Sequence, residues 1–174
     1  MQLSAGPLDV LDLGCGTGLA GGWVKDYCKR LVGVDISKEM VLLAKKKALY
    51  QETHVMSIDD YMTSIEEKFD LIIAADVFSY IGDLSQTLFL LSKVMRANGH
   101  ATFTVEAIPS GVRVPEKGFT LLKNGRFGYE KAYIDKLIEE NNLDIVLARN
   151  FSPRLDFGNP VPGYLYVVTS SSRS

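Results

Sequence analysis

A glycine-rich segment at residues 14–18 constrains the fold more than any other part of the sequence, because it alternates glycine with other residues. It directly follows the apolar run 8–13, which is typical of a strand buried on both faces of a parallel sheet. Alternate glycines let the backbone turn sharply and lie against a ligand. A helix is expected from about Leu19, and the free N–H groups at its start favour an anionic group. The segment therefore predicts a nucleotide-like binding site at the end of the first strand.

Two glycine frames are open within this segment. A G-x-G-x-x-G frame at Gly16, Gly18 and Gly21 is typical of a dinucleotide-binding site. In such sites an acidic residue about 20 positions later binds the ribose. A D-x-G-x-G-x-G frame that starts at Asp12 is better formed. Asp35 ends a second buried strand, and its carboxylate can accept hydrogen bonds from both hydroxyls of a ribose. The same carboxylate would repel a 2′-phosphate, which argues against NADP.

The composition is that of one domain, with 174 residues and a net charge of −2. This balance excludes a general binder of polyanions, and the sequence carries no specific nucleic-acid signal. Cys15 and Cys28 form no metal-ligand pattern, so no metal is expected. No signal peptide and no run long enough to span a bilayer is seen. We expect a cytoplasmic protein with reduced thiols and no membrane partner.

Strands and helices are expected to alternate along the chain. Trp23 and Val24 are expected to face inward from the first helix, and Ser37 is expected to cap the second. The second helix should bury one face formed by Met40, Leu43, Ala44 and Ala48, and the fourth helix one formed by Leu88, Leu91, Val94 and Met95. The expected strands are 8–13, 30–35, 54–58, 69–76, 100–107, 143–148 and 164–169; the expected helices are 19–28, 37–50, 61–66, 84–95 and 130–141; the long connections are 108–126 and 150–163; the ends, 1–7 and 170–174, are expected to be a short polar lead and a frayed tail.

Four stretches together resemble class I S-adenosylmethionine (SAM) dependent methyltransferases. They are DLGCGTG at 12–18, VGVDISKEM at 32–40, FDLIIAADVF at 69–78 and NGHATFTVE at 98–106. The stretches 76–84, 125–137 and 162–168 further resemble predicted methyltransferases that sometimes follow tetratricopeptide repeats, although no such repeat is present here.

The resemblance implies an α/β fold with a Rossmann-like, doubly wound sheet. The sheet would have seven strands, mostly parallel, in the order 3-2-1-4-5-7-6 with strand 7 antiparallel, and helices on both faces. It also implies that residues 1–174 form a single SAM-binding domain. The sequence departs from the family in one respect, because members usually carry N-terminal lid helices before the first strand, and such helices are not expected here. A partner or a missing N-terminal segment could then cover the cofactor.

The implied cofactor is SAM, with S-adenosylhomocysteine (SAH) as its product. The resemblance places the glycines around the methionyl part, Asp35 on the ribose, Ile36 and Met40 on adenine, and an acid after the third strand on the adenine amino group. Asp59 matches this last position, and Asp60 is the better candidate to cap the following helix. The full set of expected cofactor-binding residues is Asp12, Gly14, Cys15, Gly16, Gly18, Asp35, Ile36, Met40, Asp59, Asp60, Ala75 and Asp76.

Catalytic roles are weakly indicated. Asp76, Tyr80 and Glu106 follow or end strands near the expected methyl group, and they are the candidates. His54 and His100 are expected at the amino ends of their strands, away from the ligand edge. No Asn-Pro-Pro-aromatic motif follows the fourth strand, which argues against methylation of nucleic-acid bases.

Three functions remain open from the sequence. The first is a methyltransferase that acts on a small molecule or a protein side chain. The second is a non-catalytic SAM- or SAH-binding or scaffold domain, and the third is an NAD-dependent oxidoreductase that uses the Gly16-Gly18-Gly21 frame. Fold alone does not separate them, because function resides in the site.

Overall fold

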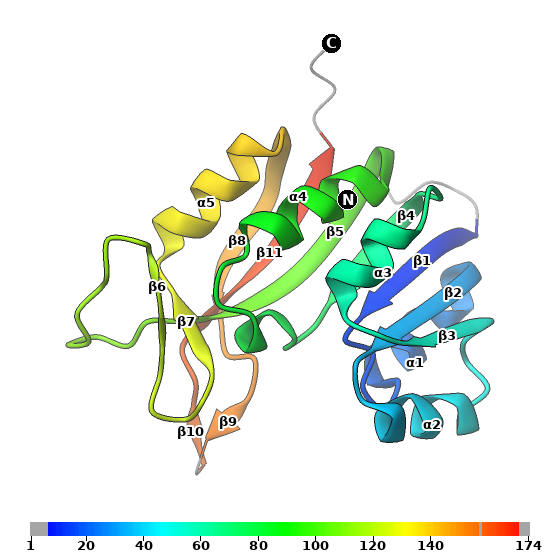
Figure 1. The fold of residues 1–174 in the computed structure, drawn as a ribbon, viewed down its shortest axis with the longest axis horizontal. Helices are drawn as coiled ribbons and strands as arrows, with labels where there is room; N and C mark the ends of the chain where they lie inside the picture. The colour runs from blue at the N-terminus through cyan, green and yellow to red at the C-terminus, as the bar shows by residue number, and fades with distance from the viewer. Residues whose placement is uncertain (1–6, 157, 171–174) are drawn as a thin grey trace.

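The computed structural model describes residues 7–156 and 158–170. A single large sheet forms the centre of the molecule, with helices packed against it (Figure 1). In chain order the elements are β1 (Leu8–Leu13), α1 (Leu19–Val24), η1 (Lys25–Tyr27), β2 (Cys28–Asp35), α2 (Lys38–Lys46), β3 (Glu52–Val55), α3 (Ile58–Ser64), β4 (Phe69–Ala74), η2 (Phe78–Tyr80), α4 (Ser85–Val94), β5 (Met95–Ala107), β6 (Phe119–Leu121), β7 (Phe127–Tyr129), α5 (Lys131–Glu140), β8 (Leu143–Phe151), β9 (Leu155–Asp156), β10 (Asn159–Pro160) and β11 (Gly163–Ser170).

The main path through the sheet runs β3-β2-β1-β4-β5-β11-β8. Strands β1 to β5 pair in parallel, whereas β11 is antiparallel to both β5 and β8. The order and the antiparallel last strand that the resemblance implied are therefore confirmed. The chain winds outward from β1 to β3 and then crosses to β4 on the other side of β1. Ligands of such sheets bind at the carboxyl ends of the strands where this switch occurs.

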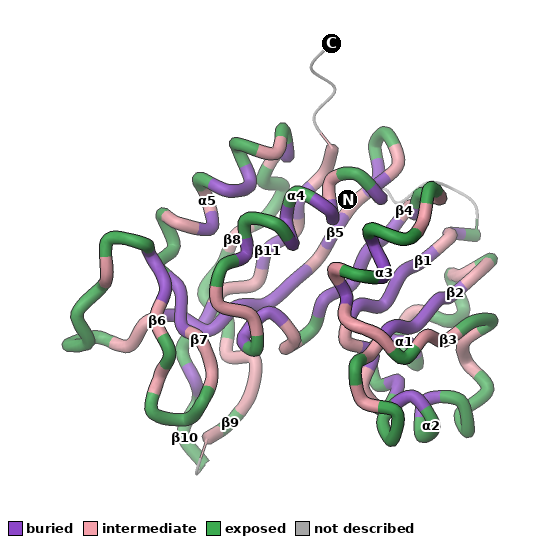
Figure 2. The backbone as a smooth tube through the Cα atoms, in the orientation of Figure 1, coloured by how far each residue is buried: buried purple, intermediate pink, exposed green. Residues whose placement is uncertain are grey.

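The core has two parts, one on each face of the sheet. Buried residues are concentrated along the central strands (Figure 2). The larger part lies between the strands and α3, α4 and α5. It includes the four residues that were expected to form the buried face of the fourth helix, Leu88, Leu91, Val94 and Met95, and all four are buried. The smaller part packs β1, β2 and β4 against α1 and the segment that follows α2. Burial on both faces explains why the central strands are continuous apolar runs.

Two short hairpins extend the sheet region beyond the predicted strands. β6, in the connection 108–126, pairs with β7, which directly follows this connection, and β7 joins the end of β5 in parallel at Glu106 and Gly128. In the connection 150–163, β9 pairs with β10. The alternation of apolar and polar residues that marks a strand in sequence needs more positions than these elements contain.

The first helix is shorter than predicted, and only one of its two predicted inward residues packs against the core. It ends at Val24, a 3-10 turn follows, and Cys28 already belongs to β2. Trp23 is 80% exposed, so its predicted inward orientation is wrong. The buried position is Gly21, where a Cβ would lie 2.4 Å from the Tyr50 hydroxyl oxygen. The helix packs closely here through a glycine, so Trp23 points outward. Val24, in contrast, is half-buried against the smaller part of the core, as predicted.

The second helix begins at the predicted cap, because the Ser37 hydroxyl accepts a hydrogen bond from the Met40 N–H. Its buried residues are Val41 and Ala44. Of the predicted face, Ala44 is therefore confirmed, whereas the burial predicted for Met40, Leu43 and Ala48 is wrong because all three are exposed. Ala44 faces the glycine loop: a Cβ on Gly18 would lie 3.6 Å from the Ala44 Cα. Small residues allow this close approach.

Other boundaries differ by a few residues. The third strand ends at Val55, and Ser57 caps α3 by accepting the Asp60 N–H at 3.1 Å, so the cap expected at Asp60 is wrong. The fourth strand ends at Ala74. The expectations for residues 1–6 and 171–174 lie outside the described residues. Within the described part of the chain, no helix has the length and apolar character to cross a membrane.

Candidate functional site

The glycine loop is held against two neighbouring strands. Gly14 and Gly16 have φ angles of 68° and 53°, which residues with a side chain rarely adopt. The Gly14 N–H donates to the Val34 carbonyl oxygen at 2.8 Å. A Cβ on Gly14 would lie 2.4 Å from Val77, just after β4. The loop thus requires glycine both for its backbone conformation and for close packing.

Asp35 ends β2 with its carboxylate fixed by two backbone donors. Oδ2 accepts the Gly16 N–H at 2.9 Å, and Oδ1 accepts the Ser37 N–H at 2.9 Å. A carboxylate oxygen has a second lone pair, so both oxygens can still accept hydrogen bonds from a ligand. The side chain is therefore oriented in advance for a pair of hydroxyl groups.

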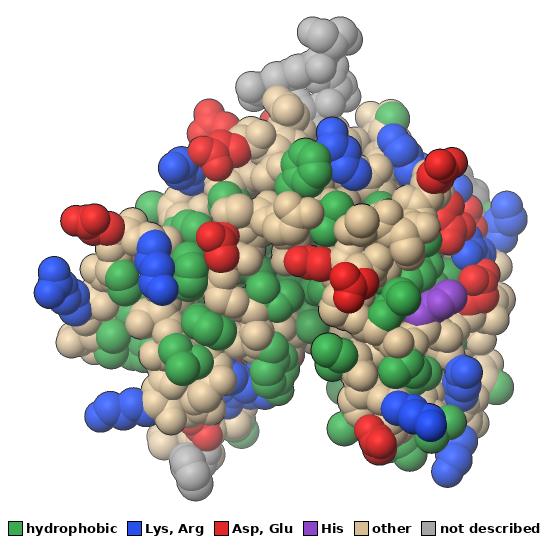
Figure 3. Space-filling model, in the orientation of Figure 1, with side chains coloured by type: hydrophobic (Ala, Val, Ile, Leu, Met, Phe, Trp, Pro, Cys, Tyr) green, Lys and Arg blue, Asp and Glu red, His purple; other side chains and the backbone are tan. Residues whose placement is uncertain are grey.

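A pocket of about 570 Å³ opens at the carboxyl ends of β1 to β4. Figure 3 shows this side of the molecule hollowed between the part that carries α2 and the part that carries the β6–β7 hairpin. We call it the carboxyl-edge pocket; its lining residues are Gly14, Gly16, Asp35, Ile36, Ser57, Ile58, Asp59, Ala75, Asp76, Val77, Tyr80 and Ile81.

Asp59 presents a buried acceptor to this pocket. Its Oδ2 accepts from the Thr87 hydroxyl at 3.2 Å, whereas its Oδ1 is buried without a partner among the described residues. Burial raises the pKa of this carboxyl, and the hydrogen bond from Thr87 partly opposes the rise. A buried acceptor without a donor is costly. A ligand N–H group would satisfy it.

Asp12 lies behind the loop rather than in the pocket. It is 1% exposed, and its Oδ2 accepts from the Tyr50 hydroxyl at 2.6 Å. Burial raises the pKa of Asp12 to about 6, against the opposing effect of the Tyr50 hydrogen bond. Cys15 is also buried, and burial raises the pKa of its thiol to about 12. Both side chains support the loop from inside the protein.

Three more of the expected residues lie outside the lining. Gly18 starts α1 and faces Tyr50, Met40 lies on the exposed side of α2, and Asp60 is exposed on α3. Conversely, sequence reasoning did not single out Ser57, Ile58, Val77 or Ile81 as site residues. The last two follow β4 directly, so the rule that ligands lie at strand ends could have identified them. Ser57 and Ile58 were missed because the predicted third strand, 54–58, included them, whereas the observed strand ends at Val55.

The three catalytic candidates converge on a residue that was not predicted. Arg126, in the turn of the β6–β7 hairpin, donates to Asp76 at 2.8 Å, to Ser79 at 3.1 Å and to the Tyr80 hydroxyl at 2.6 Å. Its guanidinium also stacks on the Tyr80 ring, 4.5 Å from the centroid. Asp76 has a φ of 56°, and its N–H donates to the Thr104 hydroxyl at 2.9 Å.

The Glu106 carboxylate also lies near Arg126, but Glu106 is completely buried and does not line the pocket. Its Oε1 accepts from Arg154 at 2.6 Å and lies 3.6 Å from Arg126, and its Oε2 is 3.4 Å from the Asn124 side-chain amide. Both arginines come from the two long connections. Neither His54 nor His100 lines the pocket.

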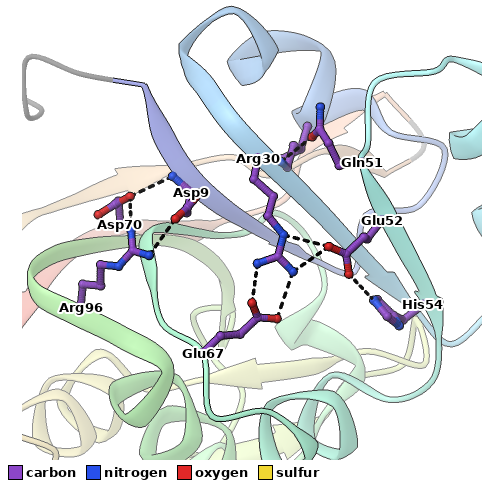
Figure 4. Close-up of polar contacts among 9 residues, drawn as sticks. Asp9, Arg30, Gln51, Glu52, His54, Glu67, Asp70 and Arg96 are labelled. Carbon is purple, nitrogen blue, oxygen red and sulfur yellow. Dashed lines mark hydrogen bonds and ion pairs between the residues drawn. The ribbon is translucent and has the colours of Figure 1, made fainter.

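Charged residues at the opposite edge of the sheet pair with one another (Figure 4). Arg30 binds Glu52 and both carboxylate oxygens of Glu67, which lowers the pKa of Glu67. Arg96 similarly joins Asp9 at 2.7 Å and Asp70 at 2.6 Å. In the described parts of the chain, no group of three or more His, Cys, Asp and Glu side chains could hold a metal ion.

The chain is similar to known methyltransferases in sequence and in fold. The family described as "Methyltransferase domain" matches residues 11–101, just over half of the chain. An uncharacterized methyltransferase of Schizosaccharomyces pombe is 30% identical over 115 residues, covering 60% of this chain and 40% of that protein. A probable S-adenosylmethionine-dependent methyltransferase of Saccharomyces cerevisiae is 28% identical over 149 residues, covering 79% and 48%. The chain thus spans about half the length or less of these curated relatives.

A solved structure shares the whole fold. It is a SAM-dependent methyltransferase from Methanosarcina mazei, with a TM-score of 0.75 and 16% identity. The match covers 98% of this chain and 94% of that one. At this level of identity the likeness supports the fold alone, and it agrees with the Rossmann-like sheet described above.

Proposed function

The chain belongs to the family of class I methyltransferase domains, and from this premise we propose that it binds SAM in the carboxyl-edge pocket and transfers the methyl group to an acceptor. The observation that carries the proposal is a pair of acidic side chains in one largely apolar pocket. Asp35 offers two oriented oxygens, and Asp59 offers one buried, unpartnered oxygen. A nucleoside has the matching groups, a ribose diol and a base amino group.

The adenosyl part fits the residues at the β2 and β3 ends. Asp35 would accept the ribose hydroxyls, and Asp59 would accept the adenine amino group through Oδ1. Ile36 and Ile58 both line the pocket and supply apolar contacts for the base. Because Met40 lies outside the lining, we build the adenine wall from these two isoleucines instead.

The methionyl part fits the glycine loop and the end of β4. Gly14 and Gly16 expose bare backbone to the pocket, and the segment at Ala75 and Asp76 lies opposite. Carboxylates around the pocket favour a ligand with positive charge. SAM has such a charge on its sulfonium and ammonium groups.

When bound, SAM supplies a methyl group on a sulfonium whose leaving group is a neutral thioether, so no acid is needed. The protein then contributes mainly by orienting the acceptor, which is worth about 7–11 kcal/mol in favourable cases. Asp76 and Tyr80 are both engaged by Arg126, and Glu106 by Arg154. None of the three is a free base, so we propose that positioning dominates.

The acceptor is proposed to be a small molecule or a protein side chain. The described residues include two free cysteines, Cys15 and Cys28, and free thiols fit a reducing compartment. We therefore also propose that the protein works in the cytoplasm.

The proposal is tested by calorimetric titration of the chain with SAM, SAH and NAD in parallel. We expect binding of SAM and SAH and none of NAD. Asp59→Asn should weaken SAM binding about tenfold, because the amide presents a donor or a weaker acceptor to the adenine amino group. Asp60→Asn, the exposed neighbour outside the pocket lining, is the matched control and should bind as the unmodified chain does. Binding of NAD alone would overturn the assignment of the glycine loop.

A further inference from the structure

The arginines of the two long connections meet at one buried carboxylate beside the carboxyl-edge pocket. Arg126 and Arg154 are 18% and 20% exposed, and both lie within 3.6 Å of Glu106. Arg126 also contacts Asp76 and Tyr80, which line the pocket. We propose that Arg126 and Arg154 bind a carboxylate group of the methyl acceptor; this inference rests on the proposed function and names the acceptor class.

The hydrogen-bond donors of the two arginines support this assignment. The Nε of Arg154 is buried and has no partner among the described residues. A buried N–H without an acceptor is unfavourable, and the penalty is relieved when a ligand oxygen binds there. The planar guanidinium presents paired N–H groups that match the two oxygens of a carboxylate. Arg126 lies against two lining residues, so an acceptor that reaches it is at the pocket rim.

The charge beside the two arginines depends on SAM. Arg126 and Arg154 are matched by Asp76 and Glu106, so these four residues sum to zero. Asp35 and Asp59 also line the pocket and make it negative before a ligand binds. SAM has a sulfonium, an ammonium and a carboxylate, and its one net positive charge makes the site more favourable for an anion. An acceptor with one carboxylate adds less repulsion there than a phosphate dianion.

The same balance predicts coupling between the two ligands. SAH lacks the positive charge of the sulfonium, so an anion beside the pocket is attracted less strongly when SAH is bound. A carboxylate should therefore bind more tightly when SAM is present than when SAH is present. Asp76 is the shared element, because it pairs with Arg126 and also lines the pocket.

A purely structural role would give a different result. In that case the arginines only tie the β6–β7 hairpin and the 150–163 connection to the sheet, and no added anion would reach them. The two roles are separated by observing the guanidinium groups directly, since ligand contact changes the environment of their Nε–H groups.

The experiment is a proton–nitrogen NMR titration of the arginine Nε–H signals in the presence of saturating SAM. The probes are acetate, propionate and benzoate, each paired with its neutral amide. Signals are assigned from Arg126→Gln and Arg154→Gln. Arg113→Gln assigns the control signal, because Arg113 is exposed and outside the cluster. We expect the Arg126 and Arg154 signals to shift in a saturable way with acids but not amides.

Affinity for the acids should fall at least tenfold in Arg126→Gln and recover in part in Arg126→Lys, which restores the charge without the paired donors. It should fall at least threefold when SAH replaces SAM. Arg113→Gln should behave as the unmodified chain. If the chain binds SAM but its arginine signals respond equally to acids and amides, this inference is overturned while the proposed function stands. If the chain does not bind SAM, the proposed function itself fails.

Discussion

The two edges of the parallel strands differ in how completely their acidic side chains are paired. At the amino edge, Arg30 and Arg96 each bind two carboxylates, and the charges satisfy one another. At the carboxyl edge, Asp35 is oriented by backbone N–H groups, and Asp59 retains an oxygen without a partner. Charges that are satisfied by each other stabilise a fold, whereas acceptors left open in a pocket are available to a ligand. The carboxyl edge also contains ion pairs, Asp76 with Arg126 and Glu106 with Arg154, and these lie beside the acids that have open acceptors.

The carboxyl edge is most sensitive at Gly14. An alanine there combines a left-handed backbone with a Cβ 2.4 Å from Val77. We expect Gly14→Ala to destabilise the protein by about 2–5 kcal/mol, the sum of backbone strain and overpacking, and to abolish SAM binding. Urea unfolding measures the first effect and calorimetry the second.

Gly111→Ala is the control for this prediction, since Gly111 has a φ of 85° but nothing within 4 Å of the added Cβ. It should cost only about 1–2 kcal/mol, from the backbone alone. Equal losses in the two variants would show that close packing at Gly14 contributes nothing.

Asp12, which is buried behind the glycine loop, makes the stability of the protein depend on pH. Its pKa is about 6 in the folded protein and 3.8 in the unfolded chain, so the folded state holds the proton more tightly. This carboxyl therefore stabilises the fold below about pH 4, and that contribution is lost as the pH rises to about 6. The loss is about 3 kcal/mol, from two pKa units.

Asp12→Asn isolates this contribution, because the amide oxygen can still accept from the Tyr50 hydroxyl but does not titrate. The unfolding free energy of the unmodified chain, measured between pH 4 and 7, should fall relative to that of the variant. Parallel curves for the two proteins would mean that Asp12 has an ordinary pKa.

Asp35 tests the pocket side of the comparison. Asp35→Asn replaces an oxygen that can accept from a ribose hydroxyl with an amide nitrogen that cannot. We expect SAM affinity to fall by about 1–3 kcal/mol, the usual value for a hydrogen bond to a charged group. Calorimetry measures it, and Glu52→Gln, an acid at the amino end of β3, serves as the matched control. If both variants bind SAM equally well, the distinction between the edges is lost.

The sequence predicted the carboxyl edge better than the contacts behind it, for a physical reason. The glycine loop and Asp35 are encoded by local spacing, and the seven-strand order followed from the family resemblance. Trp23 was misplaced because the helix packs through Gly21 against Tyr50, a contact between residues far apart in the chain. The Arg126 contacts with Asp76 and Tyr80 join residues that are even farther apart in the chain, and no local pattern marks such a pair.

The smallest effect is expected at the amino edge. Arg96 is 42% exposed, and its partners Asp9 and Asp70 are 14% and 29% exposed. Arg96→Gln should cost about 0.2–1 kcal/mol of unfolding free energy, because solvent already screens these ion pairs. The cost should shrink further in high salt, and SAM affinity should not change. Urea unfolding at low and high salt, with calorimetry, gives all three values. A cost well above 2 kcal/mol that salt leaves unchanged would mean that these charges act as a buried network. Exposed, screened ion pairs would then not distinguish the amino edge from the carboxyl edge.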